Sequence, residues 1–546
     1  MTSLITLRKS VALTFVALYL LIGVPLWYKL TTIYRASLPI EYIQDLYNNK
    51  FKEIHLTIPV FVKSDTYRFP DIHDAVQIQV NHLLRSKRQY VDWSLEIFPY
   101  NETIIDQATA RGDDYHIVDL VLDEFVGYNL PYDSKTTIVY FDDTSVASND
   151  LPFFIAQTLV EHTFELEWNH WSLKPDQNEP EQLANSDIAV NYNPNIHLSM
   201  SLLNGDGSPV AWEIDNTLKN IFTPFREMIS PLVNFTVDAQ IAYYNDLNLY
   251  QLNNVSNPTW HDLSHVIDLS ELSTTNYFVE QNAINLVIVF PGKETNLDGL
   301  QFVNTNEENQ WGSFIVPQWG VLIVNKSPLE DNALVTENYL NPIMLKFVKD
   351  LLRLLGVLDT KDKELSSPYI VIDSVKRIRI IDNLNKAVET LWSLIKLTHQ
   401  FQQMAIPQEV LEDVTNALDM RLELIDLLNN PHVGSNMDWN KALLMSNEIV
   451  KSCEKAFFHG EMLQQNFFPQ EHKLAVYLPL LGPLSVVIFS GVKALFNEKK
   501  SESEEDITSK DEKKGLEEDI AEELKETKEL GAIDDKDSIS TPASTD

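Results

Sequence analysis

The chain has 546 residues and a formal net charge of −37, with 42 Lys and Arg against 79 Asp and Glu. This excess of acid argues against a nucleic-acid binder and against a polybasic grip on anionic lipid, because both need basic patches that neutralise phosphates. Hydrophobic residues make up 44% of the chain, which is ample for a sizeable core. The mean hydropathy of −0.16 limits membrane segments to a few.

Residues 11–28, VALTFVALYLLIGVPLWY, predict a first transmembrane helix. At about 1.5 Å per residue this run spans about 27 Å, close to a hydrocarbon core of about 30 Å. A cleaved signal peptide is the alternative. A retained anchor is favoured because the run is longer than a usual signal core and no A-x-A site follows it directly. Trp27 and Tyr28 are typical of the membrane interface.

Residues 29–335 alternate strand-like and helix-like runs, which predicts an α/β domain, a mixed sheet with packed helices. Several of the runs are apolar throughout and rich in β-branched residues, as in strands covered on both faces. The predicted strands are 54–62, 91–100, 115–122, 136–141, 195–204, 233–244, 283–290 and 319–325, and residues 151–166 predict a helix.

Residues 336–473 change to a helical period. The apolar side chains recur at spacings of three and four, which places them on one helical face: Ile381, Leu384, Val388, Leu391 and Ile395. Pro407 and the Asn-Pro pair at 430–431 interrupt the pattern, and a further helical segment runs from 438 to about 467. This predicts antiparallel helices joined by short loops.

Residues 474–496 predict a second transmembrane helix, with a buried core helix as the alternative. Pro479, Gly482 and Pro483 predict a kink and close packing against a neighbouring membrane helix. Residues 497–546 follow as an acidic tail. From residue 498 onward it holds 18 Asp and Glu against 8 Lys, which predicts disorder.

Four sequons indicate the orientation. Asn101, Asn234, Asn254 and Asn325 each begin an N-x-[ST] sequence, and all lie between the two predicted spans. Because N-glycans are added in the secretory lumen, we expect residues 29–473 to be luminal and both short ends, 1–10 and 497–546, to be cytosolic.

A search for catalytic and metal motifs finds no strong candidate. Asp142 and Asp143 follow a predicted strand, where paired acids can hold a divalent cation and a sugar nucleotide, although an Asp there more often caps a turn. His162 and His170 are a weak ligand pair. The NGDGS run at 204–208 predicts a turn, because the spaced acidic ligands of a calcium loop are missing. No metal or cofactor is therefore expected.

Cys453 is the single cysteine, so no intrachain disulfide can form. Its place in the helical stretch SNEIVKSCEKAFF favours a small buried side chain. A disulfide with a partner chain and a catalytic thiol are the alternatives, and no local Cys–His signature supports the second.

Three stretches resemble the PIG-S subunit family of the GPI transamidase. They are PLWYKLTTIYRASLP (25–39), LLNGDGSPVAWEI continuing to SPLVNFTVDAQIAYY (202–244), and FFPQEHKLAVYLPLLGPL (467–484). The resemblance covers almost the whole chain except the acidic tail, which is not a feature expected of the family.

The resemblance implies a subunit of a complex in the endoplasmic reticulum membrane that replaces the C-terminal signal of a proprotein with a preformed GPI lipid. It implies that catalysis belongs to a separate cysteine-protease-like subunit and that this chain is non-catalytic. The implied partners are that subunit, other subunits, the membrane and, indirectly, the GPI lipid and the proprotein. Two alternatives are a luminal glycosyltransferase that uses Asp142 and Asp143, and a luminal receptor or chaperone for glycoprotein or lipid.

Overall fold

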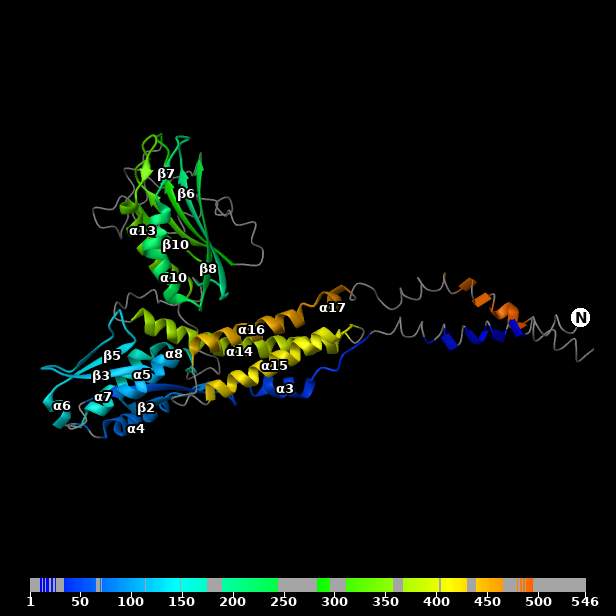
Figure 1. The fold of residues 1–546 in the computed structure, drawn as a ribbon, viewed down its shortest axis with the longest axis horizontal. Coiled ribbons are helices and arrows are strands. Elements are labelled where there is room, and N and C mark those ends of the chain that lie inside the picture. Colours follow the sequence, from blue (N-terminus) through cyan, green and yellow to red (C-terminus); the bar gives the residue numbers. More distant parts are fainter. Residues whose placement is uncertain are drawn as a thin grey trace, which may run out of the picture. The chain divides into compact units, whose positions relative to one another are not determined.

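The computed structural model describes residues 34–64, 69, 71–112, 114–147, 149–173, 189–243, 282–294, 311–356, 367–401, 404–429 and 438–464, with single positions within 10–25 and 479–493. The chain forms two compact units. The larger comprises residues 36–402 and 407–459, and the smaller comprises 1–35, 403–406 and 460–546. The larger unit contains two mixed sheets and a set of long helices (Figure 1).

The first sheet has five strands in the order β2-β1-β3-β5-β4. The strands are β1 (His55–Lys63), β2 (Asp92–Pro99), β3 (His116–Leu122), β4 (Gly127–Asn129) and β5 (Thr136–Phe141). All neighbours are parallel except β4, which pairs antiparallel with β5 at the edge. The accompanying helices are α4 (Ile72–Leu84), α5 (Glu102–Arg111), α6 (Asp143–Ala147), α7 (Leu151–Gln157), the π-helix η2 (Thr158–Thr163) and α8 (Glu165–His170).

The second sheet also has five strands, in the order β8-β6-β9-β11-β10. The strands are β6 (Asn195–Asn204), β8 (Asn234–Tyr243), β9 (Asn282–Phe290), β10 (Trp311–Val316) and β11 (Gly320–Asn325). Its accompanying helices are α9 (Ile214–Thr217), the π-helix η3 (Leu218–Phe222), α10 (Thr223–Ile229) and α13 (Glu337–Leu354). A two-stranded parallel ladder joins β7 (Ala211–Trp212) to β12 (Leu334–Val335).

The two sheets share one topology. Numbered within each sheet, the order is 2-1-3-5-4 in both, with the fourth strand antiparallel to the fifth and every other pair parallel. In this arrangement the first strand of each sheet, β1 or β6, is an interior strand next to the central one, β3 or β9. The chain therefore builds the same α/β unit twice, and this repetition is not evident in the residue patterns of the strands.

The interior strand β1 is apolar because both of its faces are covered. In β1 every residue from Leu56 to Val62 is buried, including Pro59. A proline in a central strand normally costs a ladder hydrogen bond. The pairing of β1 with β3 begins only at Val60, so Pro59 lies where β1 has β2 as its single neighbour.

Four long helices form the remainder of the larger unit: α3 (Ile40–Asn48), α14 (Pro368–Gln400), α15 (Gln408–Asn429) and α16 (Trp439–Phe457). Ion pairs give their directions. Lys455 lies 2.8 Å from Asp413 and His459 lies 3.1 Å from Glu409, so α16 runs antiparallel to α15. Asn383 donates to Asn447 at 2.8 Å and Lys386 lies 2.7 Å from Glu454, so α14 and α16 run parallel.

The predicted strands and helices agree closely with these elements. All eight predicted strands are present, and α14 carries the predicted apolar stripe, Ile381 to Ile395, on its buried face. The predicted mixed sheet with packed helices is present twice. Within the described ranges no helix is both long and apolar enough to cross a membrane. About half of the residues of each predicted span, 11–28 and 474–496, lie outside the described positions, and the tail 497–546 lies wholly outside them.

Candidate functional site

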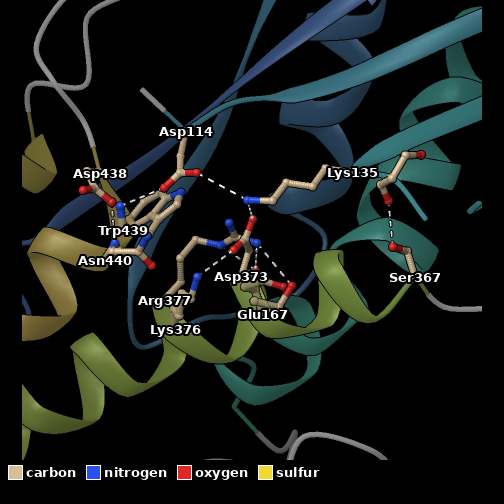
Figure 2. A network of polar contacts seen from close by, with 12 residues as sticks. Asp114, Lys135, Glu167, Ser367, Asp373, Lys376, Arg377, Asp438, Trp439 and Asn440 are labelled. Carbon is tan, nitrogen blue, oxygen red and sulfur yellow. Dashed lines mark hydrogen bonds and ion pairs between the residues drawn. The ribbon is translucent and has the colours of Figure 1, made fainter. Parts of the chain in front are cut away.

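A network of charged side chains joins the first sheet to the helical segment (Figure 2). At its centre is Asp373 in α14, which lies 2.5 Å from Lys135 Nζ and accepts a hydrogen bond from Lys376 at 3.3 Å. Lys135 directly precedes β5 and also lies 3.4 Å from Asp114, just before β3. The backbone N–H of Trp439 donates to Asp114 at 2.9 Å, so α16 begins on the same network.

The second half of the network is a buried pair between α14 and α8. Arg377 Nε and Nη2 both approach Oε1 of Glu167, at 2.7 and 2.5 Å. The exposed fractions of the two side chains are 4% and 0%. The guanidinium also lies 5.4 Å from the ring centre of Phe164 and 5.3 Å from that of Trp439, where the ring faces attract a cation.

The pKa values of these groups follow from burial and from their neighbours. Burial alone would raise the pKa of Asp373, but the cations Lys135, Lys376 and Arg377 outweigh it and hold that pKa below its usual range. Burial raises the pKa of Asp114, against the opposing charge of Lys135. Burial would lower the pKa of the Lys135 ammonium, but Asp373 and Asp114 together raise it.

The network encloses a cavity of about 20 Å³, lined by Asp114, His116, Lys135, Asp373 and Arg377 among others. Such a volume holds about one water molecule and no organic substrate. Its position also differs from that of an α/β enzyme site. Ligands of open α/β sheets bind beyond the carboxyl ends of the strands, whereas Asp114 and Lys135 precede the amino ends of β3 and β5.

The charges of three carboxylates and three cations balance one another in this network. The carboxylates are Asp114, Glu167 and Asp373, and the cations are Lys135, Lys376 and Arg377. Lys135 is held protonated by its two carboxylates, which makes it a poor nucleophile. The arrangement therefore fixes the helical segment against the first sheet, since buried ion pairs are satisfied only in one geometry.

In the acidic pair predicted from the sequence, Asp142 caps a helix and Asp143 is the first residue of that helix. Asp142 directly precedes α6, and its carboxylate accepts hydrogen bonds from Thr144 Oγ1 at 2.6 Å and from the Ser145 N–H at 2.8 Å. These bonds hold the pKa of Asp142 below its usual range. No group of three His, Cys, Asp or Glu side chains within the described ranges can hold a metal ion. The turn-capping interpretation is confirmed.

The two histidines do not converge. The ring of His162 stacks on Tyr128 with centroids 4.4 Å apart, whereas His170 lies 3.4 Å from Asp382. Cys453 is fully buried, as predicted from its helical context, and burial and the neighbouring Glu454 raise the pKa of its thiol to about 12. A thiol with so high a pKa is not a nucleophile at neutral pH.

The NGDGS run forms a turn, and this turn fills the gap between the carboxyl ends of β6 and β9. A Cβ on Gly205 would lie 2.3 Å from the backbone nitrogen of Gly292, so the loops after β6 and β9 touch. The carboxylate of Asp206 accepts from the Lys293 N–H at 3.0 and 3.3 Å. This is the position between the first and third strands where doubly wound sheets bind ligands, and here main chain occupies it.

The four sequons differ in their surroundings. Asn101 is exposed and caps α5 through its Oδ1, which accepts from the N–H groups of Thr103 and Ile104. Asn234 is exposed at the start of β8. Asn325 is 2% exposed. Its Nδ2, the atom that would carry a glycan, donates to the Val289 carbonyl at 3.0 Å.

A glycan on Asn325 would have to replace the hydrogen bond to Val289, and the use of this sequon stays a prediction. Asn254 lies outside the described residues. Pro479 and Pro483 are exposed within the described positions of the second predicted span, and Gly482 is half-buried. Their packing against a partner helix stays a prediction.

Sequence reasoning missed the charged network. The available signal was the run PYIVIDSVKRIRII at 368–381, in which Asp373, Lys376 and Arg377 interrupt an otherwise apolar stretch of helix. Charged residues at such positions are buried only when paired. Their partners Lys135 and Glu167 lie more than two hundred residues earlier, and no local pattern connects them.

Comparison with known proteins identifies the family. The sequence profile of PIG-S, Phosphatidylinositol-glycan biosynthesis class S protein, matches residues 14–502. The chain is 57% identical over 543 residues to GPI transamidase component GPI17 of Saccharomyces cerevisiae, which covers 98% of this chain and 99% of that protein.

More distant relatives have similar names. The GPI transamidase component PIG-S homolog of Schizosaccharomyces pombe is 26% identical over 87% of this chain and 82% of its own length. The GPI-anchor transamidase component PIGS of Homo sapiens is 24% identical over 90% and 96%. The chain therefore belongs to the PIG-S family.

Proposed function

We propose that this chain is a subunit of the GPI transamidase, the complex of the endoplasmic reticulum membrane that replaces the C-terminal signal of a proprotein with a GPI anchor. The observation that carries the proposal is the 57% identity, over 98% of the chain, to a protein named as a component of that enzyme. The glycosyltransferase alternative gains no support, because Asp142 is used as a helix cap.

We infer that the subunit is non-catalytic. Transamidation through a cysteine nucleophile needs an exposed thiol of low pKa, and Cys453 is buried with a raised pKa. The charged network lies at the amino edge of the first sheet and is internally compensated. In the second sheet, the main-chain contact at Gly205 and Gly292 occupies the place where a doubly wound sheet would bind a substrate.

We also propose a two-pass arrangement, with spans at 11–28 and 474–496, a luminal α/β part at 29–335 and a luminal helical part at 336–473. Residues 1–10 and the acidic tail 497–546 would be cytosolic. Chain pairings at the two approaches support it. The Ile406 N–H donates to the Tyr34 carbonyl at 3.1 Å, and His459 pairs with Glu409.

The role that fits these features is positioning. Both substrates of a transamidase for lipid anchors arrive from the bilayer, so its active site must be held at a fixed height above the membrane. A subunit with two spans and a rigid junction between its sheet and its helices supplies such a support. Orientation of reactants lowers a barrier without any chemical group.

Purification of the tagged full chain in mild detergent, followed by mass spectrometry, tests the proposal. We expect stoichiometric recovery of a cysteine-protease-like subunit and of other membrane-spanning subunits. Recovery of this chain alone from fully solubilised membranes would contradict membership of the complex. A luminal receptor would instead recover many clients at low stoichiometry.

A further inference from the structure

A basic groove opens beside the first sheet, and neither the charged network nor the membrane arrangement uses it. The groove has a volume of about 780 Å³ and is lined by the α3–β1 turn, the end of α4 and the first residues of β2. Its volume is in the range of small-molecule sites, roughly 300–1,000 Å³. We call the side chains Lys50, Lys52, Arg85 and Lys87 its basic set.

The charge of the groove is opposite to that of the protein. Acidic residues outnumber basic ones by 79 to 42 in the whole chain, yet the lining holds the four cations of the basic set and one carboxylate, Asp92. That carboxylate lies 2.8 Å from His55 Nδ1. The groove is therefore a local positive field on an acidic protein, which attracts anions and concentrates them.

Two separate elements supply the cations. Arg85 and Lys87 follow the carboxyl end of α4, where the helix dipole favours positive charge. Lys50 and Lys52 follow the carboxyl end of α3 in the same way, so two helix ends bring cations to the groove. Lys50 forms an ion pair with Glu389 at 2.6 Å, and the Lys87 ammonium lies 4.7 Å from the ring centre of Trp168. For Lys52 and Arg85, no ion pair with a described residue is found.

The rest of the lining suits a ring that carries hydroxyl groups. Phe51 and Tyr90 lie with ring centres 5.3 Å apart and provide flat apolar surface. The side-chain amides of Asn48 and Asn81 add hydrogen-bonding groups. Arginine beside lysine is a common arrangement for phosphate, because the guanidinium binds two oxygens at once.

We propose that the basic groove binds a phosphate ester carried on a sugar or inositol ring. The proposal rests on the proposed function, since a transamidase that uses a phosphatidylinositol-glycan brings this chemistry to its luminal face. Phosphate would lie among the basic set, and the ring would pack against Tyr90 and Phe51. The subunit thus binds the headgroup of the lipid substrate directly through this groove.

Calorimetric titration of the full chain, purified in detergent within its complex, tests the proposal. The probes are glycerophosphoinositol, mannose 6-phosphate, mannose and inorganic phosphate, each at low and moderate salt. We expect at least one of the two ring phosphates to bind, more weakly as salt rises, and mannose and inorganic phosphate to bind at least about tenfold more weakly. A preference for glycerophosphoinositol points to the lipid headgroup, and one for mannose 6-phosphate points to a phosphorylated sugar of the glycan.

The variant Arg85→Gln/Lys87→Gln should raise the Kd of the favoured probe by about tenfold or more, and Lys52→Gln should raise it in the same direction from the other element. The matched control Lys441→Gln/Lys451→Gln removes two exposed cations of α16 outside the groove and should leave the Kd unchanged. Equal effects of the groove and control variants would overturn the proposal. So would equal binding of inorganic phosphate and of the ring phosphates, or no binding at all.

Co-purification separates this inference from the proposed function. If the wild-type chain recovers the catalytic subunit but binds no ring phosphate, only the groove assignment fails. If the wild-type chain recovers no transamidase subunit, the proposed function fails whatever the titrations give. Melting temperatures of the variants, measured in the same detergent, exclude unfolding as the cause of a raised Kd.

Discussion

Arg377 in α14 and Glu167 in α8 form an ion pair in which the exposed fractions are 4% and 0%, with Nη2 2.5 Å from Oε1. Two hundred and ten residues separate them in the chain. The pair therefore joins the helical segment to the first α/β unit.

Removal of one partner should be costly, because the other is left as an uncompensated buried charge. We expect Arg377→Met to lower the free energy of unfolding by about 3–5 kcal/mol. The double variant Glu167→Gln/Arg377→Met should cost less than the sum of the two single changes. Urea unfolding of the full chain in detergent measures both. Lys451→Met removes one partner of an exposed pair and should stay within about 1 kcal/mol of the wild type.

His116 should make the fold sensitive to acid. Burial and then the charge of Arg377 lower its pKa from 6.5 to about 3, so between these pH values the unfolded chain binds a proton that the folded chain does not. Stability is then lost as the pH falls below 6.5, by about 1.4 kcal/mol between pH 7.5 and 5.5.

The comparison with His116→Gln isolates this effect, because Asp114 and Asp373 titrate in both proteins. Gln can also donate to Thr137, which lies 2.8 Å from His116 Nε2. Unfolding free energies at the two pH values should show the acid loss in the wild type only. A loss of the same size in His116→Gln would show that another group is responsible.

The sequons should be used unequally. Thr103→Ala removes the sequon at Asn101 and keeps its helix cap, so we expect a gain in gel mobility that equals one glycan, with unchanged stability. Asn234→Gln should give a similar shift. Asn325→Gln should give no mobility shift but a lower melting temperature, because Asn325 bonds both Val289 and Tyr339. A glycan found on Asn325 in the folded protein would contradict the observed packing.

Gly482 should matter for assembly. A Cβ at Gly482 meets no described atom within 4 Å, so Gly482→Leu changes the outer surface of the helix rather than its own packing. We expect reduced recovery of the other subunits with a normal luminal melting temperature. Gly491→Leu is the matched control, because nine residues on, about two and a half turns, it lies on the opposite face. Equal recovery of the other subunits with both variants would contradict the packing role of Gly482.

Asp142 should affect stability and not chemistry. Asp142→Ala removes the cap of α6 and should lower the melting temperature, whereas Asp142→Ser keeps a capping oxygen. Transamidation by complexes that contain either variant should equal that of the wild type. A catalytic defect in Asp142→Ser, with normal melting and normal assembly, would restore the enzymatic alternative.

Local structure was within reach of the sequence. The strands 54–62, 136–141 and 195–204 were predicted to within a residue or two, because β-branched apolar runs bounded by turns have few other solutions. The apolar stripe of α14 and the buried state of Cys453 followed from the helical period in the same way. The family resemblance also depended on local runs, such as YRASLP at 34–39.

Tertiary structure decided what depends on distant residues. The sequence does not show that the α/β pattern is one topology built twice, because strand order depends on how the chain crosses between strands. It also does not show that Asp373 pairs with Lys135, because more than two hundred residues separate them. Asn325 carries the same sequon as Asn101, yet only packing buries its amide. The basic groove likewise exists only where the α3 turn and the end of α4 converge. Local propensity determines which helices and strands form, and contacts between distant residues determine which charged and amide side chains are buried and paired.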